Sequence, residues 1–184
     1  RGNAYYDFEA ANPGKIILSL SQSMQLDRMF IGYHKRKEAV EMINACDKEY
    51  TICADVDGVL CKMRADAINV EAGFIADIKS TSYSAELEVF KENAYSQLLS
   101  YDISAALYTK IAEIQYGKPF DFYYIVISKQ DYVCHIYKAS QQSLINGRNK
   151  ISKALTSLKQ FRQTGNWPTN NIRQTFDIST YEIQ

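Results

Sequence analysis

The sequence has no run of about 18 consecutive apolar residues, the length that a membrane-spanning helix needs, so a membrane span is not expected. Its first 15 residues, RGNAYYDFEAANPGK, lack the apolar core of a signal peptide. Its four cysteines form no CxxC pair, which disfavours zinc and iron–sulfur sites and is typical of reduced thiols. These absences together predict a cytoplasmic protein without a membrane segment.

Acidic residues are also missing from one long stretch, residues 132–176, which carries seven basic residues. Two acids, Asp177 and Glu182, follow it. Because the whole chain has 21 basic and 21 acidic residues, residues 1–131 keep 14 basic and 19 acidic ones, a net charge of −5. This segregation indicates either a polyanionic partner that meets an acid-rich site or a basic helix that faces solvent.

The chain shows no repeat, linker or low-complexity segment, so residues 1–184 are expected to form a single domain. Hydrophobic periodicity and turn residues predict helices near 21–45, 87–116 and 140–163, and strands near 49–56, 59–69, 74–80, 120–128 and 132–139. The order α-β-β-β-α-β-β-α favours an α/β fold with a mixed sheet flanked by helices.

The dipeptide Asp57-Gly58 predicts a two-residue hairpin turn, because both residue types tolerate the positive φ angles of that turn. With this turn Val56 pairs with Val59. Counting outward along the two strands then places Glu49 opposite Asp66.

A second two-residue turn at Glu71-Ala72 would pair Val70 with Gly73 and set Asp66 opposite Asp77. Three carboxylates would then lie side by side across three strands. A three-residue loop would instead move Asp77 away from Asp66.

Side-chain alternation supports this register. Asp66 shares a strand face with Arg64, and Asp77 shares one with Lys79, while Ile78 is expected to point to the core. The predicted sheet therefore carries two acids and a lysine on one side.

Carboxylates on directly opposed positions repel one another, since their Cβ atoms are only about 5 Å apart. Such a cluster is tolerable if a divalent cation lies in it, and carboxylate oxygens suit Mg²⁺ or Mn²⁺ better than zinc. The alternative is a solvent-facing sheet whose acids pair with Lys62 and Arg64.

The stretch MRAD…FIADIKS resembles the PD-(D/E)XK nuclease motif, and QLLSY resembles the Q-x-x-x-Y motif of RecB-like nucleases. Two longer stretches, GVLCKMRADAI and IADIKSTSYSAELEVFKENAYSQLLSYDISAALY, are similar to the RecE (exonuclease VIII) type of phage or prophage exonuclease. The resemblance implies a restriction-endonuclease-like core with a mixed sheet.

The resemblance also implies roles for individual residues. Asp66 and Asp77 would hold Mg²⁺, with Mn²⁺ as a possible substitute and the carbonyl of Ile78 as a further ligand. From the strand count, Glu49 would complete the set, directly or through water.

Lys79 would orient or help to deprotonate the attacking water and stabilise charge on the phosphate. Gln97 and Tyr101, one turn apart on the same helix face, would position Lys79, the metal water or a DNA phosphate. The alternative for this pair is a core tyrosine with an exposed glutamine beside it.

DNA is the implied partner, with phosphate contacts from Arg64 on the sheet and from Arg148, Lys150 and Lys153 at the start of the last helix. The alternative is that this helix packs its basic side against a neighbouring subunit or faces solvent.

The resemblance implies a Mg²⁺-dependent exonuclease that degrades double-stranded DNA from 5′ ends, works with a single-strand annealing protein and forms a homo-oligomeric ring. The alternatives are an endonuclease of restriction or repair type and a non-catalytic nucleic-acid-binding module. Members of this group carry a histidine in an upstream helix, which neither His34 nor His135 matches, so an N-terminal helical segment is expected to be missing.

Overall fold

The computed structural model describes residues 2–94 and 100–168. The described helices are α1 (Asn3–Ala10), α2 (Leu20–Lys35), α3 (Lys37–Asn44), α4 (Leu87–Ala94), α5 (Tyr101–Tyr116) and α6 (Gln141–Thr164). The strands are β1 (Asp47–Val56), β2 (Val59–Asn69), β3 (Phe74–Thr81), β4 (Asp121–Ser128) and β5 (Cys134–Lys138).

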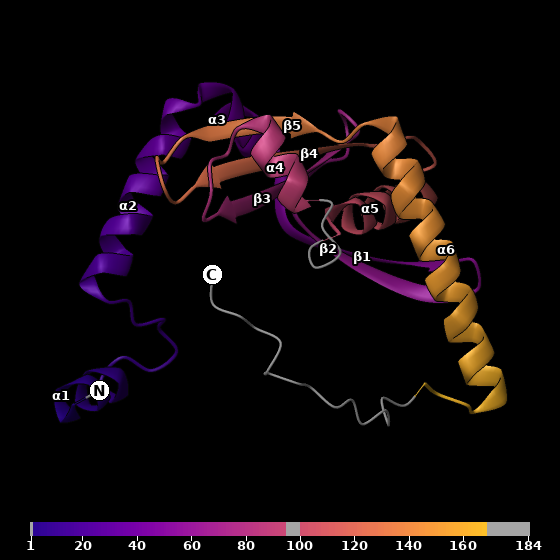
Figure 1. Ribbon diagram of the computed structural model, residues 1–184, viewed down its shortest axis with the longest axis horizontal. Helices are drawn as coiled ribbons and strands as arrows, with labels where there is room; N and C mark the ends of the chain where they lie inside the picture. Colours follow the sequence, from indigo (N-terminus) through magenta and orange to yellow (C-terminus); the bar gives the residue numbers. More distant parts are fainter. Residues whose placement is uncertain (1, 95–99, 169–184) are drawn as a thin grey trace, which may run out of the picture.

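The five strands form one sheet in the order β1-β2-β3-β4-β5 (Figure 1). The pair β3–β4 is parallel and the other three pairs are antiparallel. The predicted α/β fold with a mixed sheet flanked by helices is therefore confirmed. The parallel step occurs where the chain crosses from β3 through α4 and α5 to β4, as parallel neighbours require.

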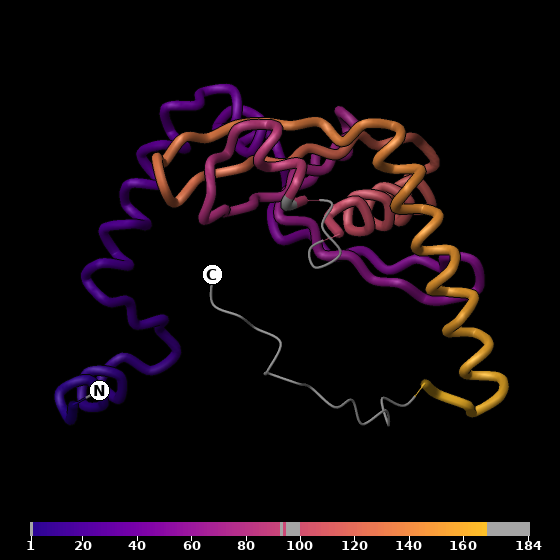
Figure 2. Tube along the Cα trace, viewed as in Figure 1, coloured from indigo at the N-terminus to yellow at the C-terminus, as the bar shows by residue number. Residues whose placement is uncertain are grey.

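Helices cover both faces of the sheet (Figure 2). One apolar cluster joins the sheet to α4, α5 and α6, with Phe122, Met63 and Ile111 among its fully buried side chains. A second, smaller cluster joins the opposite face to α2 and α3 around Ala39 and Ile125. Burial on two faces explains why β4 is an almost continuous apolar strand.

The first hairpin forms as the sequence predicts. Asp57 and Gly58 both have positive φ angles, 52° and 79°, and Val56 pairs with Val59. The Asp55 side chain accepts a hydrogen bond of 2.7 Å from the Gly58 N–H, which fixes the turn. The predicted register of β1 on β2 is confirmed.

The second turn differs from the prediction, although the register survives. It covers four residues, Val70 to Gly73, because the Gly73 N–H donates to the carbonyl of Asn69 rather than to that of Val70. The Asn69 side chain also accepts from the Ala72 N–H at 2.8 Å. Since Asn69 pairs with Phe74, the strands keep the predicted alignment.

The helix predicted over 21–45 is wrong as a single element, because non-helical backbone at Arg36 (ψ 78°) divides it into α2 and α3. Ser19 begins α2 with a capping box that includes Gln22. Near its other end Gly32 packs against the β4–β5 turn, where an added Cβ would lie 1.8 Å from the Tyr132 carbonyl oxygen. The helix predicted over 87–116 comprises α4 and α5, and residues 95–99 lie outside the described part.

The helix α2 extends away from the sheet and carries α1 at its far end (Figure 1). Several large apolar side chains on this arm are exposed, among them Leu20, Phe30 and Ile31. None of the helices in the described ranges is both long enough and apolar enough to cross a membrane.

Candidate active site

Asp66 lies where strands β2 and β3 stop pairing through their backbones. The pairing runs from Asn69–Phe74 to Ala67–Ala76, and the same register sets Asp66 opposite Asp77. At this point the Asp66 carboxylate accepts a hydrogen bond of 2.8 Å from the backbone N–H of Ile78. The side chain thus replaces a backbone acceptor, which fixes the carboxylate beside the next strand.

Asp77 and Lys79 lie on the same face of β3 and form an ion pair. Asp77 is only 7% exposed, and burial raises the pKa of its carboxyl group above the ordinary value. The negative charge of Asp66 raises this pKa further, whereas Lys79 lowers it. The strand register and the hydrogen bond of Asp66 to the Ile78 N–H place the Asp66 carboxylate beside this part of β3.

The Lys79 ammonium also lies over the ring of Tyr101, 5.0 Å from the ring centroid. Tyr101 begins α5, and its ring contacts Phe90 and Tyr124 with centroid separations of 6.1 and 6.2 Å. The Tyr124 hydroxyl donates a hydrogen bond of 3.0 Å to the Tyr101 carbonyl. Tyr101 is thus held by the core while one face of its ring contacts the lysine, a cation–π arrangement.

Two other predicted site residues have different outcomes. Ile78 does not point to the core as expected, because its side chain is 43% exposed. Ile78 and Ala76 lie on the same face of β3. Ala76 belongs to the apolar cluster beneath α2 and α3, whereas Ile78 lies outside that cluster. Gln97 lies outside the described residues.

The predicted group of three carboxylates is wrong. Glu49 forms an ion pair with Arg64, and both side chains are largely exposed. The backbone of Glu49 has a left-handed φ of 54°, which interrupts the regular alternation of β1 at the position opposite Asp66. In the ranges 2–94 and 100–168 no three acidic, histidine or cysteine side chains come together in a group that could hold a metal ion.

Two carboxylates nevertheless fit a divalent cation. The Asp77 Oδ2 atom is buried and receives no hydrogen bond of normal geometry from the described residues, so the Lys79 ammonium is its compensating group. A buried carboxylate oxygen with one cationic neighbour can accept a further cation. Mg²⁺ is commonly bound by one or two carboxylates and completes its coordination with water and substrate phosphate. Asp66, Asp77 and the Ile78 carbonyl are therefore a suitable donor set.

The three basic residues at the start of α6 have different surroundings. Lys150 forms an ion pair with the buried carboxylate of Asp102, at 3.0 Å to Oδ1 and 2.8 Å to Oδ2. Arg148 lies 3.5 Å from Glu113, and Lys153 is exposed. The prediction that these three side chains contact phosphates stays a prediction, and the charge of Lys150 also compensates the buried acid on α5.

Sequence reasoning missed Asp102, which follows Tyr101 in the first turn of α5. It is buried because α6 approaches α5 closely at Gly147, where an added Cβ would lie 2.1 Å from the Asp102 carbonyl oxygen. A glycine inside a predicted helix usually has a packing reason, and this was the available signal. The Lys150–Asp102 pair therefore connects α6 to the helix start that carries Tyr101.

Comparisons with known proteins bear on this arrangement. A family model described as "PDDEXK-like domain of unknown function (DUF3799)" matches residues 7–173. No curated protein matches the chain.

Two solved structures resemble the fold to different degrees. The crystal structure of a "Putative exonuclease" from Eubacterium rectale has a TM-score of 0.71 and 15% identity, and covers 97% of this chain and 72% of that chain. The structure of SSO0001 has a TM-score of 0.37 and 14% identity, over 67% of this chain and 57% of that chain, which is too weak to show a shared fold. The first likeness shows that the fold is shared.

Proposed function

The chain belongs to the family of PDDEXK-like domains of unknown function (DUF3799), and on this premise we propose that it is a metal-dependent exonuclease that acts on DNA. One observation carries the proposal. The Asp66 carboxylate is fixed to the N–H of Ile78, directly beside a buried Asp77 that is paired with Lys79. This is the arrangement of two acids and a lysine that phosphodiester hydrolysis by this superfamily needs.

Asp66, Asp77 and the Ile78 carbonyl would hold the cation. When bound, a divalent cation supplies Lewis-acid chemistry, since it lowers the pKa of water at the site and neutralises charge on the phosphate. Asp66 contributes a carboxylate whose orientation is already set by its hydrogen bond to β3. Asp77 contributes a buried oxygen whose partner is the Lys79 ammonium.

Lys79 would donate hydrogen bonds to the attacking water and to the phosphate oxygens, which stabilises the negative charge of the transition state. The Tyr101 ring below its ammonium limits the positions that this flexible side chain can occupy. Gln97 is proposed, from the resemblance to RecB-like nucleases, to position the same lysine or the DNA phosphate.

Finer features of the proposal rest on the resemblance of the sequence to RecE-type exonucleases. They are magnesium as the ion, 5′-to-3′ degradation of double-stranded DNA in phage-type recombination, a single-strand annealing protein as partner and a ring-shaped homo-oligomer. The E. rectale neighbour is described as a putative exonuclease, which is compatible with this proposal.

The test is digestion of end-labelled linear DNA and of covalently closed circular DNA, with and without Mg²⁺. We expect the linear DNA to be shortened from its ends, the circle to stay intact, and both results to require the metal. Asp77→Ala should abolish cleavage while DNA binding persists, because a metal ligand and a negative charge near phosphate are lost together. Lys79→Ala should leave metal binding largely intact and remove turnover.

Lys62→Ala is the matched control, since Lys62 is an exposed lysine on the adjacent strand β2. This variant should cleave DNA at the wild-type rate. Cleavage of the circle would identify an endonuclease. DNA binding without any metal-dependent cleavage by the wild-type protein would identify a non-catalytic binding module.

A further inference from the structure

A cavity of about 210 Å³ opens directly beside Lys79. Its lining consists of Lys79, three hydroxyl residues that follow it and three aromatic rings: Ser80, Thr81, Ser82, Tyr83, Phe90 and Tyr101. A lining that combines aromatic rings with hydroxyl groups and an ammonium suits a ligand that has both a flat apolar part and an anionic part. A nucleotide has this composition, because its base stacks on aromatic rings and its phosphate accepts hydrogen bonds.

Tyr83 is the most exposed of the three rings in this lining. Its side chain is exposed at 60%, and among the described residues it has no ring contact with an aromatic or cationic neighbour. Phe90 and Tyr101, in contrast, already contact one another. Single exposed aromatic residues are common on protein surfaces, so the position of Tyr83 beside Lys79 is the informative feature, not its exposure.

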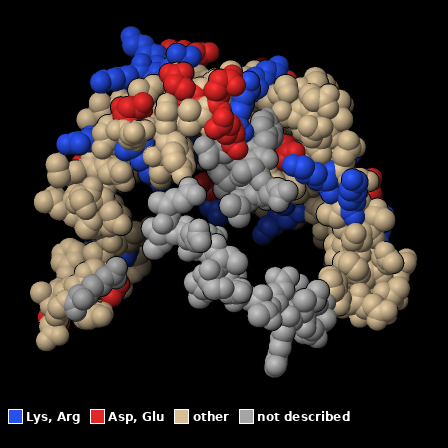
Figure 3. Space-filling model, in the orientation of Figure 1, with Lys and Arg blue, Asp and Glu red and all other residues tan. Residues whose placement is uncertain are grey.

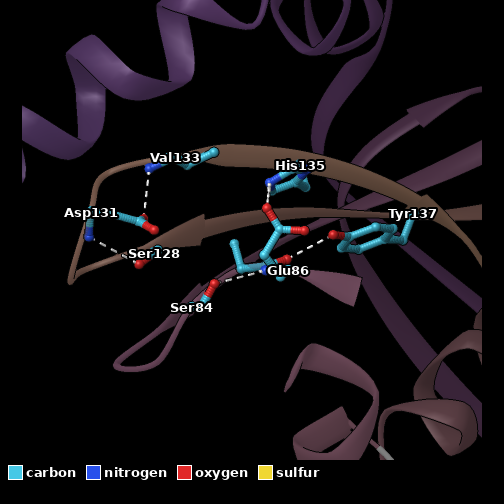
Figure 4. Close-up of polar contacts among 8 residues, drawn as sticks. Ser84, Glu86, Ser128, Asp131, Val133, His135 and Tyr137 are labelled. Atoms are coloured by element: carbon cyan, nitrogen blue, oxygen red, sulfur yellow. Dashed lines mark hydrogen bonds and ion pairs between the residues drawn. The ribbon is translucent and has the colours of Figure 1, made fainter. Parts of the chain in front are cut away.

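The loop that carries Tyr83 is anchored to β5 (Figure 4). The Tyr137 hydroxyl donates a hydrogen bond of 2.7 Å to the Ala85 carbonyl, and His135 Nε2 lies 3.5 Å from the Glu86 carboxylate. Within the loop, the Glu86 N–H donates to the Ser84 hydroxyl at 3.2 Å. An anchored loop loses little conformational entropy when a ligand binds, so Tyr83 is pre-organised at the rim of the cavity.

The size of the cavity limits what can enter. Sites for drug-sized ligands enclose about 300–1,000 Å³, so this one has room for a single base rather than for a base pair. A base inside a duplex is stacked on both faces and paired, and it must leave the helix before it can occupy a protein pocket. An occupant of this cavity must therefore come from a single strand or from a separated strand end.

Resting on the proposed function, we propose that this cavity binds the unpaired base of the nucleotide next to the phosphodiester at Lys79, with Tyr83 stacked on the base. The hydroxyl groups of Ser80, Thr81 and Ser82 then contact its sugar and phosphate. Because every base has a π-face, the cavity accepts all four bases with small differences.

The experiment measures binding without cleavage. The Asp77→Asn protein is titrated, without metal, into short fluorescent single-stranded oligonucleotides, either intact or with one abasic nucleotide moved stepwise from the 5′ end. Tyr83→Ala in this background should weaken binding of the intact strand roughly 5- to 150-fold, the equivalent of one base–aromatic stack. Tyr83→Phe should bind as before, because it keeps the ring.

The abasic series identifies the cause of any loss. One position of the oligonucleotide supplies the base that occupies the cavity. An abasic nucleotide at this position should weaken binding to the Asp77→Asn protein that keeps Tyr83. It should not weaken binding to the Asp77→Asn/Tyr83→Ala protein any further. Tyr6→Ala is the matched control, since Tyr6 is comparably exposed on the distant helix α1. A Tyr83→Ala loss of the same size on every oligonucleotide, or an abasic series with no sensitive position, would overturn the proposal.

This design separates the two hypotheses. Because the binding measurement uses an inactive variant and no metal, its result does not depend on whether the wild-type protein cleaves DNA. A wild-type protein that binds the base but never cleaves would contradict the proposed function alone.

Discussion

At the scale of single residues, the candidate active site contains a carboxylate that the fold buries. Burial and the nearby charge of Asp66 raise the pKa of Asp77, while Lys79 compensates only in part. The folded state therefore binds the proton of Asp77 more tightly than the unfolded state does. The contribution of this group to the free energy of unfolding is accordingly largest at low pH and decreases as the pH rises through the folded-state pKa. A cation bound to the Asp77 carboxylate offsets the free-energy cost of keeping this buried group ionised.

We therefore predict that Mg²⁺ stabilises the protein at pH 8 and that the effect disappears in Asp77→Asn. At a concentration about 100 times the Kd, a single bound ion adds about 2.7 kcal/mol, or roughly 5–11 °C in Tm for a chain of this size. The stabilisation by Mg²⁺ should decrease as the pH is lowered, because protons compete with the ion for the Asp77 carboxylate. Since the pKa of this group is raised, the decrease should begin at a pH above the usual aspartate pKa of about 3.9.

Thermal unfolding with Mg²⁺ or with EDTA measures this effect. Asp121→Asn is the control, because Asp121 is paired with Lys138 at the start of β4 and is not part of the proposed site. Equal Mg²⁺ stabilisation of the wild type and of Asp77→Asn would mean that the ion binds elsewhere.

At the scale of elements, the contact of α5 with α6 determines where the first turn of α5 lies. Gly147 allows the two helices to lie so close together that a side chain at position 147 would collide with the Asp102 backbone. Lys150, three residues later on α6, then reaches the buried Asp102 carboxylate. Because Asp102 follows Tyr101, this contact also fixes the residue whose ring supports Lys79.

We predict that Lys150→Met destabilises the fold rather than weakening DNA binding. The substitution leaves the Asp102 carboxylate buried without its counter-charge, which should cost about 1–3 kcal/mol given that Lys150 is itself half-exposed. Lys153→Met, less than one turn away and exposed, should change stability by less than about 0.5 kcal/mol.

Urea unfolding compares the midpoints of the two variants. The double variant Lys150→Met/Asp102→Asn should recover part of the loss, because it removes the uncompensated charge. An unchanged midpoint together with lower DNA affinity would show that Lys150 is a phosphate ligand after all.

At the scale of the whole molecule, charge and apolar surface are distributed unevenly. On the face shown in Figure 3, charged side chains gather along the top of the molecule, around α3 and α4, and on the upper part of α6, while the far ends of the molecule carry few. The acid-free stretch 132–176 begins at the β4–β5 turn and includes all of α6, so the basic excess predicted from the sequence lies mainly on one helix. Such a surface favours contact with a polyanion.

We predict that Arg148→Gln/Lys153→Gln weakens DNA binding on every sequence and lowers the slope of log affinity against log salt by roughly one to two units, about 0.9 per phosphate contact. Lys150 is excluded from this set because Asp102 holds it. Lys35→Gln/Lys37→Gln, two exposed lysines at the α2–α3 junction, is the control with the same change in net charge. Fluorescence anisotropy at several salt concentrations measures the slope, and an unchanged slope would indicate that this side of α6 does not contact DNA.

The sequence by itself determined where the strands lie and the register of β1, β2 and β3, because these depend on local patterns. Asp57-Gly58 specifies its turn through backbone conformation, and alternation alone places Asp77 and Lys79 on one face of β3. The family resemblance and the mixed α/β sheet follow from the same short stretches.

Only the tertiary structure decided which of these polar groups are buried and what compensates them. The Asp66 contact with the Ile78 N–H arises where two strands stop pairing, and the Lys150–Asp102 pair joins positions 48 residues apart in the chain. Glu49 leaves the predicted cluster because its backbone is left-handed and Arg64 offers it a partner. Spacing along a chain fixes which neighbours share a strand or helix face, but burial depends on how separate elements pack, and this packing sets the charge and the accessibility of each side chain at the site.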